Sequence, residues 1–130
     1  MDNKSINSDQ KHILYVEDHY DSQMLIRSML QGQYQVSCVK TTAEADEILE
    51  SHSIDMVLMD LSLEGDEDGL MMVRRLRSLP KYNSIPIIAI TAHAYPADRQ
   101  QALDAGCDAF VTKPVNRVFL MESIEKLFSI

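Results

Sequence analysis

Short runs of apolar residues alternate along the chain with stretches in which apolar residues recur every three or four positions. The runs predict buried strands, and the stretches between them predict amphipathic helices. The predicted strands cover residues 12–16, 34–39, 56–60, 87–90 and 109–112, and the predicted helices cover 21–30, 41–51, 69–79 and 97–105, with a fifth helix that buries Leu120, Ile124 and Leu127. Such alternation is typical of a parallel sheet with helices on both faces, so the sequence predicts a doubly wound α/β fold of five β/α units.

Particular residues mark where the helices begin and end. Thr41 and Glu44 have the spacing of a capping box at the start of the second helix. Pro80 stops the third helix, Pro96 suits the first turn of the fourth, and Gly106 is suited to end it. The spacing also predicts the inward-facing residues, which are Leu25 with Met29 and Ile26 with Leu30 in the first helix, and Leu70, Val73, Leu76 and Leu79 in the third.

Length and composition predict one domain without a membrane or nucleic-acid partner. The chain has 130 residues and 45% hydrophobic content, enough for one core. Residues 1–10 are polar throughout, which predicts a disordered tail before a domain at residues 11–130 and no signal peptide. Nothing approaches the ~20 apolar residues of a membrane span. The net charge of −8 disfavours direct nucleic-acid binding, and Cys38 and Cys107 lack metal-binding spacing. We therefore expect a cytoplasmic protein with reduced cysteines.

Four of the predicted strands end at side chains that can carry chemistry. The first leads into Glu17 and Asp18, the third ends on Asp60, the fourth leads into Thr91, and the fifth leads into Lys113. The carboxyl ends of parallel strands meet at one edge of an open α/β sheet, where such sheets bind ligands. We therefore expect three carboxylates, a hydroxyl and an ammonium group in one cleft.

The three carboxylates predict a cation site. Two carboxylates about 4 Å apart repel each other by ~4 kcal/mol at the effective dielectric constant of a protein surface. A divalent cation relieves that repulsion, and oxygen ligands together with a phosphoryl group suit Mg²⁺. Thr91 and Lys113 also suit a phosphoryl group, whose oxygens are stabilised by cations and by hydrogen-bond donors.

This constellation resembles the receiver domain of bacterial two-component response regulators, over nearly the whole chain from His12 to Phe128. The resemblance implies a flavodoxin-like sheet with strand order 2-1-3-4-5 and five flanking helices. It also implies a signalling switch that is no enzyme beyond its own phosphorylation and dephosphorylation. In that family the acid at the position of Asp60 accepts a phosphoryl group from a histidine kinase or a histidine phosphotransfer protein. Thr91 would hydrogen-bond that group, and Lys113 would pair with it.

The same resemblance implies a metal site and a switch. Glu17, Asp18 and Asp60 would bind Mg²⁺, or Mn²⁺ in its place, together with the main-chain carbonyl of Ser62. Phe110 stands where the family has a switch aromatic, and without a hydroxyl it would act through packing. We expect phosphorylation to draw Thr91 inward and Phe110 to follow. A downstream effector would then read the fourth helix and the fifth strand, near His93, Tyr95, Asp98 and Arg99.

The loop after Asp60 departs from the family pattern. The family's proline shortly after the acceptor is missing, and the loop at residues 61–69 reads as one residue longer. We expect Gly65 to make the turn. Four loop acids are interpreted as a solvated rim rather than a second metal site, namely Glu64, Asp66, Glu67 and Asp68. Elsewhere, the Lys113-Pro114 bond invites the cis form, which only X-Pro bonds adopt at modest cost.

Two other classes of protein share parts of this pattern. An EF-hand calcium loop starting at Asp60 would need a glutamate where Met71 stands. A haloacid-dehalogenase-like phosphatase would need a second aspartate where Ser62 stands. The remaining alternative is a receiver module of a hybrid sensor histidine kinase. Because the sequence ends at Ile130, directly after the last predicted helix, we favour a stand-alone receiver that signals by partner binding.

Overall fold

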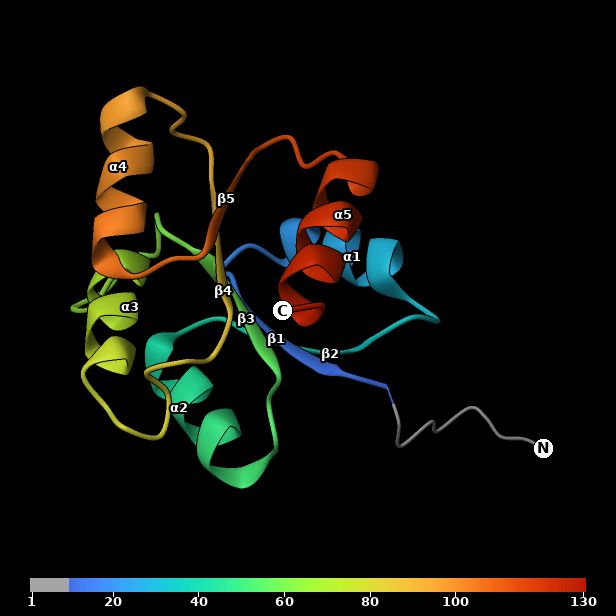
Figure 1. Ribbon diagram of the computed structural model, residues 1–130, viewed down its shortest axis with the longest axis horizontal. Helices are drawn as coiled ribbons and strands as arrows, with labels where there is room; N and C mark the ends of the chain where they lie inside the picture. Colours follow the sequence, from blue (N-terminus) through green and yellow to red (C-terminus); the bar gives the residue numbers. More distant parts are fainter. Residues whose placement is uncertain (1–9) are drawn as a thin grey trace.

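Five parallel strands form the centre of the computed structural model, which describes residues 10–130 (Figure 1). They are β1 (His12–Val16), β2 (Gln35–Val39), β3 (Met56–Asp60), β4 (Ile87–Thr91) and β5 (Ala109–Thr112). The strands pair in the order β2-β1-β3-β4-β5, and all four pairings are parallel. The doubly wound sheet and its strand order are therefore confirmed.

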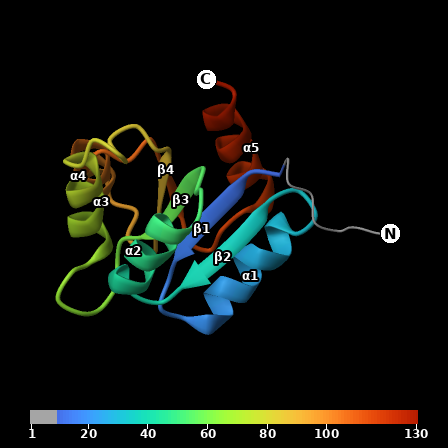
Figure 2. The same cartoon turned by 90° about the horizontal axis from the view of Figure 1, so that it is seen from below.

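Helices cover both faces of this sheet, as Figures 1 and 2 show from two directions. On one face lie α1 (Tyr20–Leu30) and α5 (Arg117–Phe128). The other face carries α2 (Thr42–Ser51), α3 (Gly69–Arg77) and α4 (Pro96–Ala105). Because strand side chains alternate between faces, Ile13 and Tyr15 join the core under α1 and α5. Leu14 and Val16 join the other core. The central strand β3 is buried at every residue.

The helix ends follow the predicted signals, with one correction. Thr41 Oγ1 accepts a hydrogen bond from the Glu44 N–H at 3.1 Å, and Glu44 Oε1 accepts one from the Thr41 N–H at 3.2 Å, so the capping box is confirmed. Gly106 ends α4 with a φ of 119°. The prediction that the third helix reaches Leu79 was wrong, because α3 ends at Arg77 and leaves Leu79 38% exposed.

The inward faces of α1 and α3 also differ in part from the predicted stripes. In α1, Ile26 and Leu30 are buried, whereas Leu25 is 47% exposed. Gln23 is buried instead, because its side-chain amide donates to the carbonyls of Glu17 at 2.7 Å and Val39 at 3.2 Å. In α3 the buried set is Gly69, Met72, Val73 and Leu76. Gln23 thus joins the carboxyl ends of β1 and β2, next to the predicted site.

Residues 1–9 of the predicted tail lie outside the described residues. Gln10 is described, and its side-chain amide donates to the carbonyl of Gly32 at 3.0 Å. Within residues 10–130, no helix has the length and apolar character needed to cross a membrane. Both cysteines are free thiols, and burial raises the pKa of Cys107 to about 12.

Candidate functional site at the carboxyl edge of the sheet

Backbone hydrogen bonds align the strand ends that carry the predicted site residues. The Glu17 N–H donates to the carbonyl of Val39 at 2.9 Å, and the Lys113 N–H donates to the carbonyl of Thr91 at 2.8 Å. Asp60 is the last residue of β3 and pairs in register with Ile90. The parallel ladder therefore brings these predicted residues to one edge, as the sequence predicted.

Asp60 is almost completely buried, with 2% of its surface exposed. Its Oδ1 accepts a hydrogen bond from the Ser62 N–H at 3.0 Å, and its Oδ2 lies 3.7 Å from Lys113 Nζ. Burial raises the pKa of Asp60 to about 6, and the neighbouring Glu17 acts in the same direction. One oxygen is thus held in place, while the other faces an ammonium group beyond hydrogen-bond distance.

Glu17 is the closer partner of Lys113. Lys113 Nζ lies 2.6 Å from Glu17 Oε1, which also accepts a hydrogen bond from the Tyr15 hydroxyl at 3.0 Å. Burial alone would raise the pKa of Glu17, but hydrogen bonds led by that of Lys113 lower it to about 2. Burial raises the pKa of Tyr15, so its hydroxyl keeps the proton that it donates. The Lys113 ammonium group therefore lies between two carboxylates. It hydrogen-bonds Glu17 and is farther from Asp60.

Asp18 offers an oxygen atom suited to a cation. Its Oδ1 is buried and has no hydrogen-bond partner. An unsatisfied buried oxygen is costly, and a cation is one group that satisfies it. Among the described residues, ligand atoms of Glu17, Asp18 and His19 all lie within 4.8 Å of one another. The side chains at this edge therefore fit a divalent cation. Sequence reasoning missed His19, although its position directly after the acid pair was a signal.

Thr91 and Phe110 occupy adjoining strands near the site. Thr91 is buried, and its Oγ1 accepts a hydrogen bond from the His93 N–H at 3.1 Å. Because the hydroxyl acts there as acceptor, its proton is available for another group. Phe110 is only 8% exposed and pairs in register with Ala89 on β4. The aromatic ring thus belongs to the core under α2, α3 and α4.

The loop between β3 and α3 is held by side-chain contacts, which corrects the prediction of a solvated acid rim for two of its four acids. Arg75 of α3 makes two hydrogen bonds of 2.8 Å to Glu67, and its guanidinium also contacts Asp46 of α2 at 3.1 Å. Asp68 Oδ1 accepts a hydrogen bond from the Met71 N–H at 2.9 Å and so caps α3. Gly65 has a φ of 119°, as expected for the residue that turns the loop.

Gly69 lets the first turn of α3 approach the acceptor strand closely. A Cβ atom at this position would overlap the main-chain carbonyl oxygen of Asp60 and would lie 2.9 Å from Leu61 Cα. Only glycine therefore fits without a backbone shift. Sequence reasoning used Gly69 only as a helix start and missed this contact. Directly after β5, the Lys113-Pro114 peptide bond is cis, as the sequence suggested.

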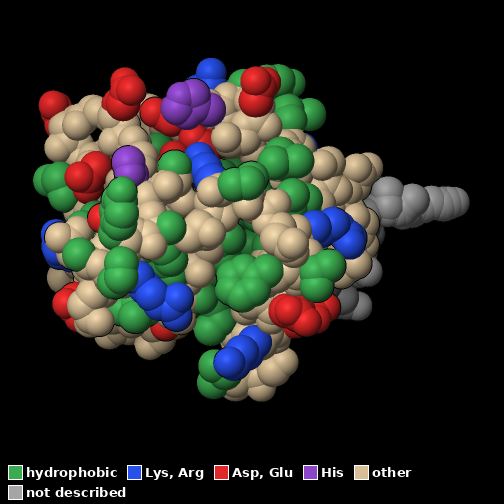
Figure 3. All heavy atoms as spheres, turned by 90° about the horizontal axis from the view of Figure 1, so that it is seen from above, with side chains coloured by type: hydrophobic (Ala, Val, Ile, Leu, Met, Phe, Trp, Pro, Cys, Tyr) green, Lys and Arg blue, Asp and Glu red, His purple; other side chains and the backbone are tan. Residues whose placement is uncertain are grey.

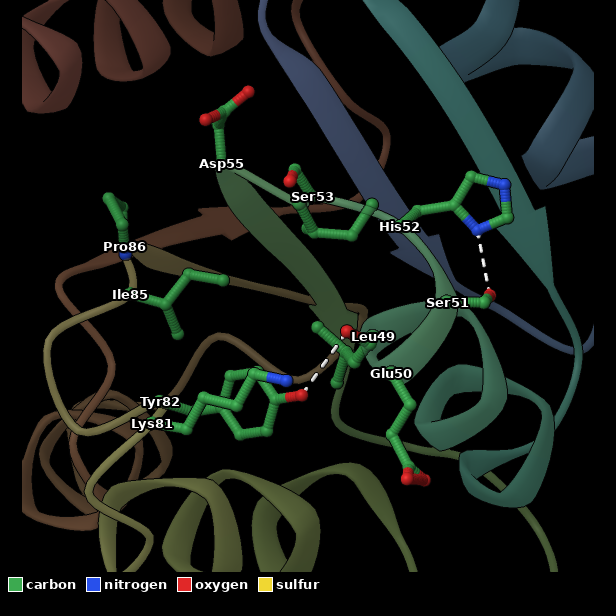
Figure 4. Close-up of a pocket in the computed structure, with 11 residues that line it drawn as sticks. Leu49, Glu50, Ser51, His52, Ser53, Asp55, Lys81, Tyr82, Ile85 and Pro86 are labelled. Carbon is green, nitrogen blue, oxygen red and sulfur yellow. Dashed lines mark hydrogen bonds between the residues drawn. The ribbon is translucent and has the colours of Figure 1, made fainter.

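The hollow shown in Figure 4 lies away from these residues. Its volume is about 540 Å³, and it is bordered by the end of α2, the α2–β3 connection and the segment before β4. The Tyr82 hydroxyl donates to the carbonyl of Leu49 at 3.2 Å across it. Because the hollow lies at the amino ends of β3 and β4, it contains none of the predicted site residues.

A known family matches this arrangement in sequence. The model of the response regulator receiver domain matches residues 13–125. This chain belongs to that family. Receivers are phosphoacceptor switches of two-component systems rather than enzymes in the ordinary sense. Membership implies interaction with histidine kinases or phosphotransfer partners, and receivers generally bind Mg²⁺ at an acidic pocket.

Several receivers of known name are similar to the chain. The transcriptional regulatory protein TorR of Escherichia coli K12 is 35% identical over 89% of this chain, which spans 49% of TorR. The polar-differentiation response regulator DivK of Brucella ovis is 28% identical, with 88% of this chain and 94% of DivK covered. The receiver domain of sensor histidine kinase PA1611 from Pseudomonas aeruginosa PAO1, solved with magnesium in its active-site cleft, is 32% identical with a TM-score of 0.83, covering 93% and 99% of the two chains. The similar proteins thus include a response regulator covered almost completely and a receiver domain of a sensor kinase. They do not favour the hybrid-kinase alternative over the stand-alone receiver.

Proposed function

We propose that Asp60 is the phosphoacceptor of this receiver. The observation that carries the proposal is the state of its two oxygens. Oδ1 is fixed by the Ser62 N–H at 3.0 Å, whereas Oδ2 lies 3.7 Å from Lys113 Nζ without a hydrogen bond to it. Oδ2 is therefore buried close to an ammonium group that does not hydrogen-bond it, a position from which it can act as the nucleophile for phosphoryl transfer.

The reaction follows from this arrangement. Asp60 Oδ2 attacks the phosphorus of a phosphohistidine presented by a kinase or a phosphotransfer protein. The new P–O bond forms as the P–N bond breaks, and the bonding electron pair returns to the imidazole of the donor. Lys113 is close enough to pair with an oxygen of the transferred group, and the Thr91 hydroxyl has a proton to donate to another. Both contacts offset the negative charge that the carboxylate gains on phosphorylation.

The carboxyl edge would hold Mg²⁺, or Mn²⁺, through Asp18, Asp60 and the Ser62 main-chain carbonyl. When bound, the cation neutralises charge on the carboxylates and on the phosphoryl oxygens. The buried Oδ1 of Asp18, which makes no hydrogen bond although His19 Nδ1 lies 3.0 Å away, supports this assignment. Glu17 Oε1 is engaged by Lys113 and Tyr15 and so fixes Lys113, whereas Glu17 Oε2 lies on the side of Asp18 and His19 and would join the ligands of the cation.

The signal would leave the site through Thr91 and Phe110. Phosphorylation would draw the Thr91 hydroxyl away from the His93 N–H, and a change in Phe110 packing would follow. Phe110 borders a hollow of about 540 Å³ between α4, β5 and α5, together with Arg99, Leu103 and Phe119. We propose that a downstream effector protein binds there, in the cytoplasm.

The acceptor is tested by labelling with acetyl phosphate and Mg²⁺, followed on a phosphate-affinity gel. The wild type should shift, and Asp60→Asn should not. Asp66→Asn is the matched control, because it removes an exposed acid from the adjoining loop. Lys113→Met keeps the acceptor and should label about 100-fold more slowly or worse, the usual cost of removing a donor to developing charge. Labelling of Asp60→Asn at the wild-type rate would refute the assignment.

A further inference from the structure

His19 stands at the start of α1, but its side chain does not cap that helix. It is the N-cap residue of α1, where Ser, Thr, Asp or Asn normally accepts a hydrogen bond from the first turn. The imidazole makes no such bond. Its Nδ1 lies instead 3.0 Å from Asp18 Oδ1 and 3.3 Å from Glu17 Oε2. The ring has therefore turned back toward the acid pair.

Asp18 has a buried oxygen atom beside this imidazole. Although His19 Nδ1 is near its Oδ1, that oxygen has no hydrogen-bond partner and is buried. The His19 side chain is 73% exposed, so the imidazole closes the acid pair from the solvent side. Figure 3 shows histidine, acidic and basic side chains gathered together on the face seen from above. The ligand atoms of His19, Asp18 and Glu17 thus lie within 4.8 Å of one another, close enough to bind one ion, and the His19 side chain is largely exposed.

We propose that His19 Nδ1 is a ligand of the receiver's cation, which makes the site prefer Mn²⁺ and later first-row ions over Mg²⁺. The inference rests on the proposed cation site at Asp18. Mg²⁺ selects oxygen ligands, whereas an imidazole nitrogen suits transition metals. A site of carboxylates alone would discriminate little in favour of Mn²⁺. The added nitrogen creates that discrimination, and only the neutral imidazole can supply its lone pair.

The competing explanation is that His19 is a protonated partner of the two acids. The two explanations predict opposite effects of removing the ring. If His19 is a ligand, His19→Gln weakens Mn²⁺ binding. If it is an imidazolium that occupies the place of the cation, His19→Gln removes a repelling charge and strengthens the binding of both Mn²⁺ and Mg²⁺.

Mn²⁺ and Mg²⁺ titrations of the full chain decide between them, combined with pulsed electron paramagnetic resonance of bound Mn²⁺. The wild type should show modulation from a directly bound nitrogen. His19→Gln should lose it and should bind Mn²⁺ about tenfold more weakly, while its Mg²⁺ affinity changes by less than about twofold. His93→Gln is the matched control, because His93 is another exposed histidine of this edge. That variant should keep the wild-type modulation and both affinities.

The outcomes separate this inference from the proposed function. Absence of nitrogen modulation in the wild type, or equal or tighter Mn²⁺ binding by His19→Gln, would overturn the role of His19 and leave the acceptor assignment standing. Asp18→Asn should weaken binding of both metals. If Asp18→Asn binds both as the wild type does, the cation site itself is misplaced, and the His19 inference falls with it.

Discussion

Replacing Asp60 with asparagine should stabilise the fold in the absence of metal. The carboxylate of Asp60 is buried, and burial raises its pKa from an ordinary 3.8 to about 6. The difference, 6 minus 3.8, corresponds to about 3 kcal/mol at about 1.4 kcal/mol for each pKa unit. This is the cost of keeping the group charged in the folded state. Asparagine has nearly the same shape without the charge, so we expect Asp60→Asn to raise the free energy of unfolding by about 2 to 3 kcal/mol at neutral pH.

The stability difference between Asp60→Asn and the wild type depends on pH because the pKa of Asp60 is raised in the folded state. Between about pH 4 and pH 6 the folded state binds a proton at Asp60 that the unfolded state has released, so the stability of the wild type falls as the pH rises through this window. Above about pH 6, Asp60 is charged in the folded state, and the wild type is destabilised by the full amount. The lowered pKa of Glu17, from 4.5 to about 2, adds stability that is lost only as the pH falls through the range between these values. Asp60 and Glu17 therefore change the stability of the fold in largely separate pH ranges.

Urea unfolding in the presence of a chelator, from pH 4 to pH 8, measures the effect. The gap between Asp60→Asn and the wild type should be full at neutral pH and should close toward pH 4. Asp66→Asn, an exposed acid in the adjoining loop, should stay within about 0.5 kcal/mol of the wild type. An Asp60→Asn variant that is no more stable than the wild type at neutral pH, or a gap as large at pH 4 as at pH 7, would show that charging Asp60 in the folded state has no such cost.

Three further predictions concern the surroundings of the acceptor. Gly69→Ala should destabilise the fold by about 1 to 3 kcal/mol, because the new Cβ overlaps the Asp60 carbonyl oxygen. Urea unfolding measures this. Arg75→Gln should cost only about 0.5 to 1 kcal/mol, since its ion pairs are partly exposed, yet amide exchange should quicken in the loop that Glu67 anchors. Thr91→Ala should still bind beryllofluoride, but its amide NMR shifts should be much smaller along α4 than in the wild type.

Each of these has a clear contrary result. Wild-type stability of Gly69→Ala would show that α3 can move away from β3 at no cost. Unchanged exchange at residues 61–68 in Arg75→Gln would show that the loop does not depend on its ion pairs. Shifts along α4 in Thr91→Ala as large as in the wild type would show that the hydroxyl does not couple the site to that surface.

The sequence predicts the positions of the site residues well because each follows a buried strand. An apolar run such as the one ending at Asp60 fixes where the strand ends, and parallel pairing then fixes which edge its last side chain reaches. The capping box was predictable for the same local reason, since the Thr41 and Glu44 side chains each accept a hydrogen bond from the other's backbone N–H, three residues away.

Contacts between residues far apart in the sequence could not be predicted from such local patterns. Lys113 has two carboxylates within reach, and only the structure places its Nζ at 2.6 Å from Glu17 and 3.7 Å from Asp60. The first helix contains two apolar pairs of equal spacing, and burial of the polar Gln23 decides between them through carbonyls on two strands. The local sequence predicts a solvated Glu67 because no neighbouring residue indicates its hydrogen bond with Arg75.

Chemical identification of the phosphorylated residue tests most directly whether Asp60 is the acceptor. After incubation with acetyl phosphate and Mg²⁺, borohydride reduction converts a phosphorylated aspartate into homoserine, which peptide mass spectrometry assigns to one position. We expect homoserine at residue 60 alone, dependent on Mg²⁺ or Mn²⁺. Homoserine at Asp18, Asp66 or Asp68 in the wild type would contradict the claim that Asp60 is the acceptor.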